Sequence, residues 1–130
     1  MANYYGSART NYFKVKDLAR FKAELDGLCD IVERQDGTVG LFPGGRTDSG
    51  HFPEFDDDDE PFDFAEEVAK HLAEGWVLVL MQNGAEKLRY LDGYAVAINH
   101  RLDRIEINIS TIEELARAAW PGANVTDCTY

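Results

Sequence analysis

The feature that most constrains the fold is an apolar run without interruption, Trp76 to Met81. A strand with one wet face alternates apolar and polar residues, whereas a run that is apolar at every position is typical of a central strand. We therefore expect this segment in the interior of a sheet, covered on both faces. The run is far too short to span a bilayer, which needs about 20 apolar residues.

Other segments have the periodicity of strands. Residues 94–99 alternate bulky with small side chains, which gives one bulky face and one flat face on which another surface can pack closely. Residues 104–109 alternate isoleucines with polar residues, as in a strand with one wet face, and 100–103 form the turn between these strands. Asp36-Gly37 between the short apolar runs 31–34 and 38–42 predicts a hairpin. A further short strand is expected over 11–16.

Three segments have the periodicity of helices. The first is capped by Asp17 and has an apolar stripe of Leu18, Phe21, Leu25 and Leu28. The second is capped by Asp63, with Glu66 three positions on, and ends at Gly75. The third begins at Ser110 or Thr111, and its stripe is Ile112, Leu115, Ala116 and Ala119.

The predicted order of elements is β, α, β, β, long loop, α, β, β, β, α. This order indicates an α+β fold in one domain, residues 1–130, with a mostly antiparallel sheet of about six strands and three helices over one face. Its first six elements match a ferredoxin-like unit, extended by a hairpin and a closing helix. The long loop covers about residues 43–62 and is acidic. Loops of this length are usually functional or mobile.

The negative charge of the chain is concentrated in and after this loop. Nine of its 24 acids lie between Glu54 and Glu67, and the other 15 face 13 Lys and Arg, so the net charge of −11 falls to −2 elsewhere. Such a local field repels nucleic acid and membrane surfaces and attracts basic partners. Part of this negative charge has a structural explanation. Asp63, Glu66 and Glu67 lie at the start of a predicted helix, where negative side chains interact favourably with the positive end of the helix dipole.

Three interpretations of the acidic run stay open. It is a solvated loop that keeps the chain soluble, a site for a hard cation such as calcium, or a binding surface for a basic protein that imitates nucleic-acid phosphates. The spacing of Asp56, Asp58 and Glu60 lacks the glycine and the bidentate glutamate of a calcium-binding hand. Aromatic rings interleaved with the acids favour the binding surface, because interfaces use aromatic residues as anchors. The predicted partner-binding residues are Phe52, Glu54, Phe55, Asp56, Asp57, Asp58, Asp59, Glu60, Glu66 and Glu67.

The opening segment has the opposite sign, with five bases against one acid between Met1 and Lys22 and with aromatic residues among them. Bases with aromatics can bind single-stranded nucleic acid. The preferred interpretation is a wet face or a counter-charge for the acidic loop. We therefore expect no direct nucleic-acid partner.

The sequence has no recognisable catalytic or cofactor motif. Asp48, Ser49 and His51 are close in sequence, but no nucleophile elbow accompanies them. The three histidines lack ligand spacing, and two distant cysteines have no metal or redox spacing. We assign no catalytic residue, metal ligand or cofactor. Two alternatives stay open: a small hydrolytic or metal-dependent enzyme built around His51 and the acidic loop, and a homodimeric structural protein that uses Tyr94, Ala95 and Ala97 as a sheet interface.

The segments Asn11 to Asp17 (NYFKVKD) and Ala85 to Ala95 (AEKLRYLDGYA) resemble small uncharacterised proteins carried by bacteriophages and other mobile elements. Combined with the charge, this resemblance implies a counter-defence protein of the anti-restriction or anti-CRISPR kind in the cytoplasm of a bacterial host. Dedicated nucleic-acid mimics usually spread their acids over a rigid surface, whereas these acids are concentrated in a loop. The implied function is inhibition of a basic, nucleic-acid-handling complex by a plug or clamp that occludes one groove, without enzymatic activity. No signal peptide or membrane segment is expected at the start of the chain.

Overall fold

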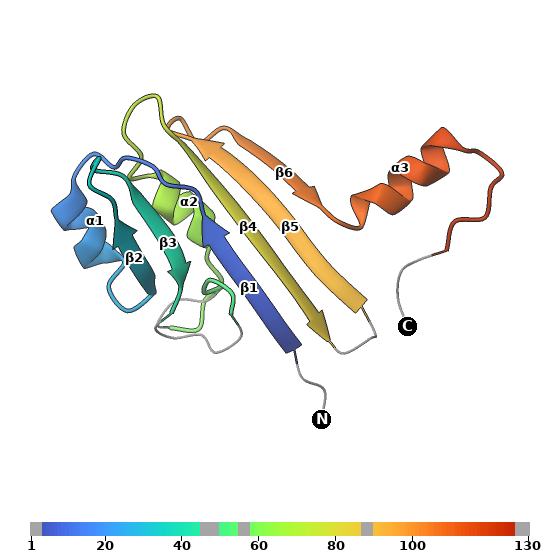
Figure 1. The fold of residues 1–130 in the computed structure, drawn as a ribbon, viewed down its shortest axis with the longest axis horizontal. Coiled ribbons are helices and arrows are strands. Elements are labelled where there is room, and N and C mark those ends of the chain that lie inside the picture. The colour runs from blue at the N-terminus through green and yellow to red at the C-terminus, as the bar shows by residue number, and fades with distance from the viewer. Residues whose placement is uncertain (1–3, 45–49, 55–57, 87–89, 127–130) are drawn as a thin grey trace.

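The computed structural model of the chain describes residues 4–44, 50–54, 58–86 and 90–126. In chain order its elements are β1 (Tyr4–Thr10), α1 (Leu18–Glu24), β2 (Cys29–Glu33), β3 (Val39–Pro43), α2 (Phe64–Ala69), β4 (Val77–Glu86), β5 (Tyr90–Asn99), β6 (Arg104–Asn108) and α3 (Thr111–Ala119). The predicted α+β class and the predicted order of elements are confirmed. Figure 1 shows the strands side by side, with α3 at the far end from α1.

The strands form an antiparallel sheet in the order β1-β4-β5-β6, beside a two-stranded ladder of β2 and β3. The ladder joins the sheet next to β1: Phe13 and Val39 exchange backbone hydrogen bonds of 2.9 and 2.8 Å, and the buried Thr10 Oγ1 accepts from the Leu41 N–H at 2.8 Å. The first four strands therefore lie in the order β4-β1-β3-β2, as in a ferredoxin-like unit. The hairpin of β5 and β6 extends this unit by two antiparallel strands.

The first strand differs from the prediction over 11–16. The ladder with β4 ends at Thr10, and the following residues make only isolated bridges, from Phe13 to Val39 and from Val15 to Leu72. Asn11 continues the connection to β4: its backbone N–H donates to the Val79 carbonyl at 3.0 Å, and its side-chain Oδ1 accepts from the Val79 N–H at 2.8 Å. The alternation in this segment thus reflects burial of Phe13 in the core rather than a regular strand.

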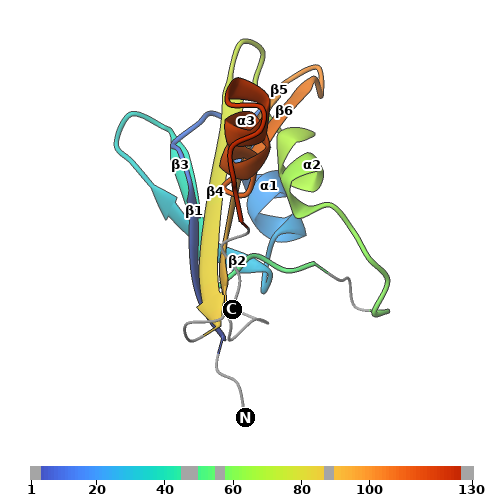
Figure 2. The ribbon, with the colours of Figure 1, turned by 90° about the vertical axis from the view of Figure 1, so that its right-hand side faces the viewer.

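The first two helices lie on one side of the sheet (Figure 2), as predicted. Asp17 and Asp63 cap them by accepting hydrogen bonds from the backbone N–H groups of Arg20 and Glu66, both at 3.2 Å. The second helix ends at Ala69 rather than near Gly75. The chain after it is drawn into pairing with the opening segment, because Lys16 N donates to His71 O and Ala73 N donates to Lys14 O, both at 2.9 Å.

The hydrophobic core lies between these helices and the inner face of the sheet. Its fully buried side chains include Phe13, Phe21, Leu72, Leu80 and Val96, each no more than 1% exposed. The opposite, outer face of the sheet is not covered by any described element, and Met81 on β4 is 58% exposed. The prediction that the apolar run 76–81 is covered on both faces is therefore wrong for this chain.

The third helix does not close over the sheet. It extends beyond β6 (Figure 1), and none of its residues is buried. The prediction of a closing helix is also wrong. The apolar stripe predicted for α3 is present, but it stays exposed: Ile112 is 64% and Leu115 58% exposed.

Candidate functional site

Aromatic residues hold both ends of the acidic segment, residues 50–63, against the core. Phe52 is 3% exposed, and its ring stacks on Phe64 with the centroids 4.7 Å apart. Phe62 meets Phe64 edge-on at 6.5 Å, and the Phe62 N–H donates to the Glu54 carbonyl at 3.1 Å. These contacts join the two ends of the acidic segment to each other and to the start of α2.

Two polar contacts with β4 position the segment further. The His51 side chain is buried, and its Nε2 lies 2.6 Å from the Asn83 carbonyl oxygen, which requires a proton on that nitrogen. The Phe52 N–H donates to Gln82 Oε1 at 3.3 Å. The acids are therefore presented by a segment whose base is part of the folded core.

The described carboxylates of this segment, on Glu54 and on Asp58 to Glu60, face solvent. We call the exposed acids on it and on the first turn of α2 the acidic surface: Glu54, Asp58, Asp59, Glu60, Glu66 and Glu67. Asp59 has a positive φ of 58°, a left-handed conformation that Asp and Asn tolerate better than most residues. A concentration of negative charge at this end of the sheet follows.

Nearby bases offset only part of this charge. Asp63, the cap of α2, also forms an ion pair with Arg104, and Arg104 contacts Glu106 at 2.7 Å. Lys70 pairs with Glu67 at 3.0 Å. Of the opening bases, Arg20 pairs with Glu24 at 3.0 Å and Lys22 with Glu33 at 2.6 Å. The pair of Lys22 and Glu33 lies outside the acidic surface, whereas Lys16 and Arg20 line a small cleft together with Glu67. The opening bases are therefore divided between an exposed face and a counter-charge near α2.

A cleft of about 420 Å³ opens beside the acidic surface. Its lining combines aromatic rings and prolines with the carboxylates of Glu54 and Asp63, and Tyr94 contributes from β5. Burial raises the pKa of the Tyr94 phenol, and the negative charges of Asp63 and Glu54 raise it further. The cleft therefore combines apolar walls with a negative potential, which suits the guanidinium or ammonium group of a partner's side chain.

The structure changes the role of one predicted site residue. Phe52 belongs to the core and is not placed to act as an exposed anchor. Phe55, Asp56 and Asp57 lie outside the described residues. The other predicted residues are exposed and lie in one stretch from Glu54 to Glu67.

The histidines lie apart and have different partners. His71 Nε2 is 2.7 Å from Glu24 Oε2, and His100 Nδ1 accepts from the Gly75 N–H at 3.2 Å. Within the described ranges, no group of three or more His, Cys, Asp or Glu side chains could hold a metal ion. Asp48 and Ser49 lie outside those ranges.

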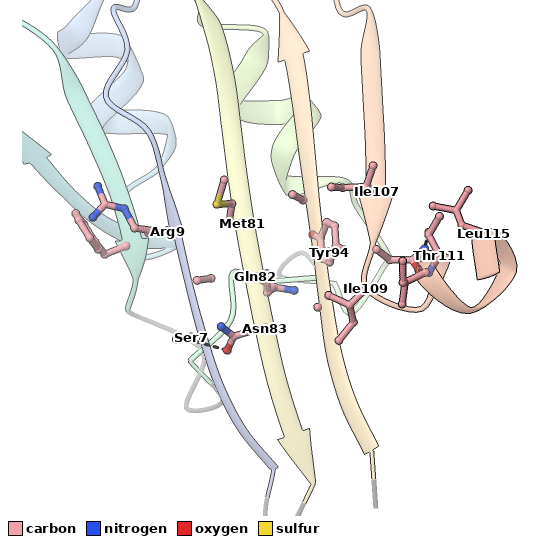
Figure 3. Close-up of a pocket in the computed structure, with 16 residues that line it drawn as sticks. Ser7, Arg9, Met81, Gln82, Asn83, Tyr94, Ile107, Ile109, Thr111 and Leu115 are labelled. Carbon is pink, nitrogen blue, oxygen red and sulfur yellow. Dashed lines mark hydrogen bonds between the residues drawn. The ribbon is translucent and has the colours of Figure 1, made fainter. Parts of the chain in front are cut away.

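A second concave region lies on the outer face of the sheet (Figure 3). This groove has a volume of about 970 Å³ and a mostly apolar lining from β1, β4, β5, β6 and the start of α3, with Phe42 of β3. Sequence reasoning missed it because it assumed that the apolar strand is covered on both faces. The flat side predicted for residues 94–99 is part of it, since Ala95 lines the groove.

Comparison with protein-family models, with curated proteins and with solved structures finds no match to this chain. Among the helices that the structure describes, none has the length and apolar character needed to cross a membrane.

Proposed function

We propose that the protein is a non-enzymatic acidic binding protein that inhibits a basic, nucleic-acid-handling host complex by stoichiometric occlusion. The observation that supports this function best is the acidic surface beside an acid-lined aromatic cleft, on a segment anchored in the core by Phe52 and His51. An anchored segment loses less conformational freedom on binding than a free acidic loop, so more of the interaction free energy appears as affinity.

The acidic surface and the cleft have separate roles in this proposal. Exposed carboxylates attract a basic groove over distance and raise the association rate, an effect screened beyond about 8 Å at physiological ionic strength. The cleft receives one basic side chain, whose charge Glu54 balances, because Asp63 is already paired with Arg104. The proposal that this inhibition counters a host defence rests on the sequence resemblance and on the negative charge of the acidic surface.

The test removes charge from the acidic surface without changing its shape. The triple variant Asp58→Asn, Asp59→Asn and Glu60→Gln keeps side-chain size, and Asn tolerates the positive φ at position 59. A matched control, Asp26→Asn, Glu33→Gln and Glu74→Gln, removes the same charge at exposed positions outside the acidic surface. Both variants must have a thermal unfolding midpoint close to that of the wild type, so that a change in binding is not caused by unfolding.

The measurement has two stages. Immobilised protein first captures its partner from host lysate at low salt. The purified partner is then titrated with each variant while it holds a labelled oligonucleotide. We expect displacement that saturates at a fixed stoichiometry, with affinity reduced about tenfold in the acidic-surface variant and little changed in the control. Equal displacement by both triple variants, or displacement insensitive to salt, would contradict the proposal.

A further inference from the structure

The outer face of the sheet presents aligned apolar side chains to solvent. Met81, Ala95 and Ile107 lie opposite one another on β4, β5 and β6, and Val79, Ala97 and Ile105 form the next row. Met81 is 58% exposed, Ile107 64% and Ile105 73%. The small residues of β5 leave a shallow depression between the larger residues of its neighbours, which is the floor of the groove in Figure 3.

The third helix presents a second apolar surface next to this one. Ile112 and Leu115 line the groove with exposures of 64% and 58%, and Trp120 at the end of the helix is 65% exposed. A nine-residue helix that buries no residue has little to stabilise it, because short helices depend on tertiary packing for most of their stability. Among the residues that the structure describes, none therefore covers the apolar side of the helix or this face of the sheet.

The helix of the same chain is held away from the sheet face. Ile109 still donates to the Gly93 carbonyl at 2.9 Å, so pairing with β5 continues almost to the start of α3. Asn108 Oδ1 then accepts from the Thr111 N–H at 3.1 Å and from the Ser110 hydroxyl at 2.5 Å. This short, hydrogen-bonded connection directs α3 outward, so it does not cover the row of Met81, Ala95 and Ile107.

The area of this surface matches one side of a protein interface. A fully exposed Ile, Leu or Met side chain has roughly 100 Å² of apolar accessible surface, as its transfer free energy implies. A fully exposed tryptophan side chain has roughly 200 Å². The exposures of Met81, Ile105, Ile107, Ile109, Ile112, Leu115 and Trp120 then give about 500 Å². A standard interface buries about 800 Å² per partner, of which about 500 Å² is apolar.

The charges around the groove are self-complementary. Arg9 lines the groove, and its guanidinium carbon lies 5.0 Å from the centroid of the Phe42 ring, which places positive charge at the β1 side of the groove. The first turn of α3, at the β6 side, carries Glu113 and Glu114. A two-fold axis through the groove places the β1 side of one copy against the β6 side of the other. The positive margin of each copy then lies against the negative margin of its partner, which is favourable.

We propose that the protein is a two-fold homodimer in which the apolar stripe of each α3 packs in the outer-face groove of the other copy. The acidic segment lies on the α2 side of the sheet (Figure 2), so the dimer leaves both acidic surfaces accessible. Two copies of the acidic surface on one particle would increase avidity for a partner with two basic sites. The homodimer does not depend on the proposed inhibitory function.

The test is the mass of the full chain in solution, measured by sedimentation equilibrium over a wide concentration range, in moderate and in high salt. We expect twice the chain mass of 14.6 kDa, retained at high salt because apolar contacts are not screened. The variants Leu115→Glu and Ile107→Glu each place a charge on an exposed position of the interface. Ala23→Glu adds the same charge at an exposed position of α1, on the opposite side of the sheet, and is the matched control.

The outcomes separate the proposal from its alternatives. A dimeric wild type and control, with both interface variants monomeric and folded by circular dichroism, would support it. A monomeric wild type at all concentrations, a dimer unaffected by either substitution, or an open-ended series of larger species would overturn it. Because no partner is present in this experiment, its failure is distinguishable from failure of the acidic surface to bind.

Discussion

Substitution of Phe52 by alanine distinguishes the two roles that sequence and structure give this residue. An exposed anchor would affect partner binding and leave stability unchanged, whereas a core residue stabilises the fold. Phe52 is 3% exposed and stacks on Phe64 at 4.7 Å. Truncation of a buried phenylalanine costs about 3–5 kcal/mol. We expect about 3 kcal/mol, because Phe52 lines the open cleft and water can occupy the space that its ring leaves.

Thermal unfolding followed by circular dichroism measures this effect. For a domain of this size, 1 kcal/mol shifts Tm by about 3–5 °C, so Phe52→Ala should lower Tm by about 10–15 °C. Phe52→Leu, which keeps most of the buried surface, should lower Tm by only about 3–5 °C. Phe62→Ala is the matched control, since Phe62 belongs to the same segment but is only half-buried, and it should have an intermediate effect. A Tm for Phe52→Ala within about 2 °C of the wild type would refute the packing argument and restore Phe52 as a surface anchor.

Two further predictions concern the junction of the sheet and the buried thiol. Thr10 is 1% exposed, and its hydroxyl accepts from the Leu41 N–H at 2.8 Å; Thr10→Val leaves that donor unsatisfied and should cost about 1–3 kcal/mol in urea unfolding. Thr10→Ser keeps the hydroxyl, loses only the buried methyl group and should cost clearly less, whereas a Thr10→Val variant as stable as the wild type would contradict the hydrogen-bond argument. Burial, and to a smaller extent Asp30, raises the pKa of the Cys29 thiol to about 12 from 9.0, which lowers its thiolate fraction near neutral pH about a thousandfold. In a Cys128→Ser background, a thiol reagent should therefore react with Cys29 only after unfolding, and because the folded pKa is the higher one, stability should fall as pH rises from about 9 towards 12. Rapid labelling of the native protein would contradict this burial.

Local patterns in the sequence determined most of the elements. The hairpin around Asp36-Gly37 and the helix caps at Asp17 and Asp63 were predicted correctly, because turns and caps depend on residues that are neighbours in the chain. The first strand was misplaced because apolar alternation records burial and not hydrogen bonding. Phe13 is buried in the core and Val15 packs against it, but they bridge to Val39 and Leu72 instead of continuing the ladder with β4.

The exposed acids were equally visible in the sequence, since charged side chains without buried partners remain in water. Only the tertiary structure showed how they are held. The stack of Phe52 on Phe64 and the contact of His51 with Asn83 join residues that no local pattern relates. Because of these contacts Phe52, which was predicted to be an exposed anchor, is a core residue. The same contacts form the cleft beside the acidic surface.

The sequence by itself thus determined the fold class, the order of the elements and the position of the negative charge, because periodicity, turn chemistry and charge are local properties. The tertiary structure decided which faces are covered. An apolar run specifies that water must be excluded, but not whether the covering layer belongs to the same chain. In this protein two helices cover the inner face, while the short connection at Asn108 directs α3 away from the outer one. The physical reason is geometric: coverage depends on where distant elements lie in space.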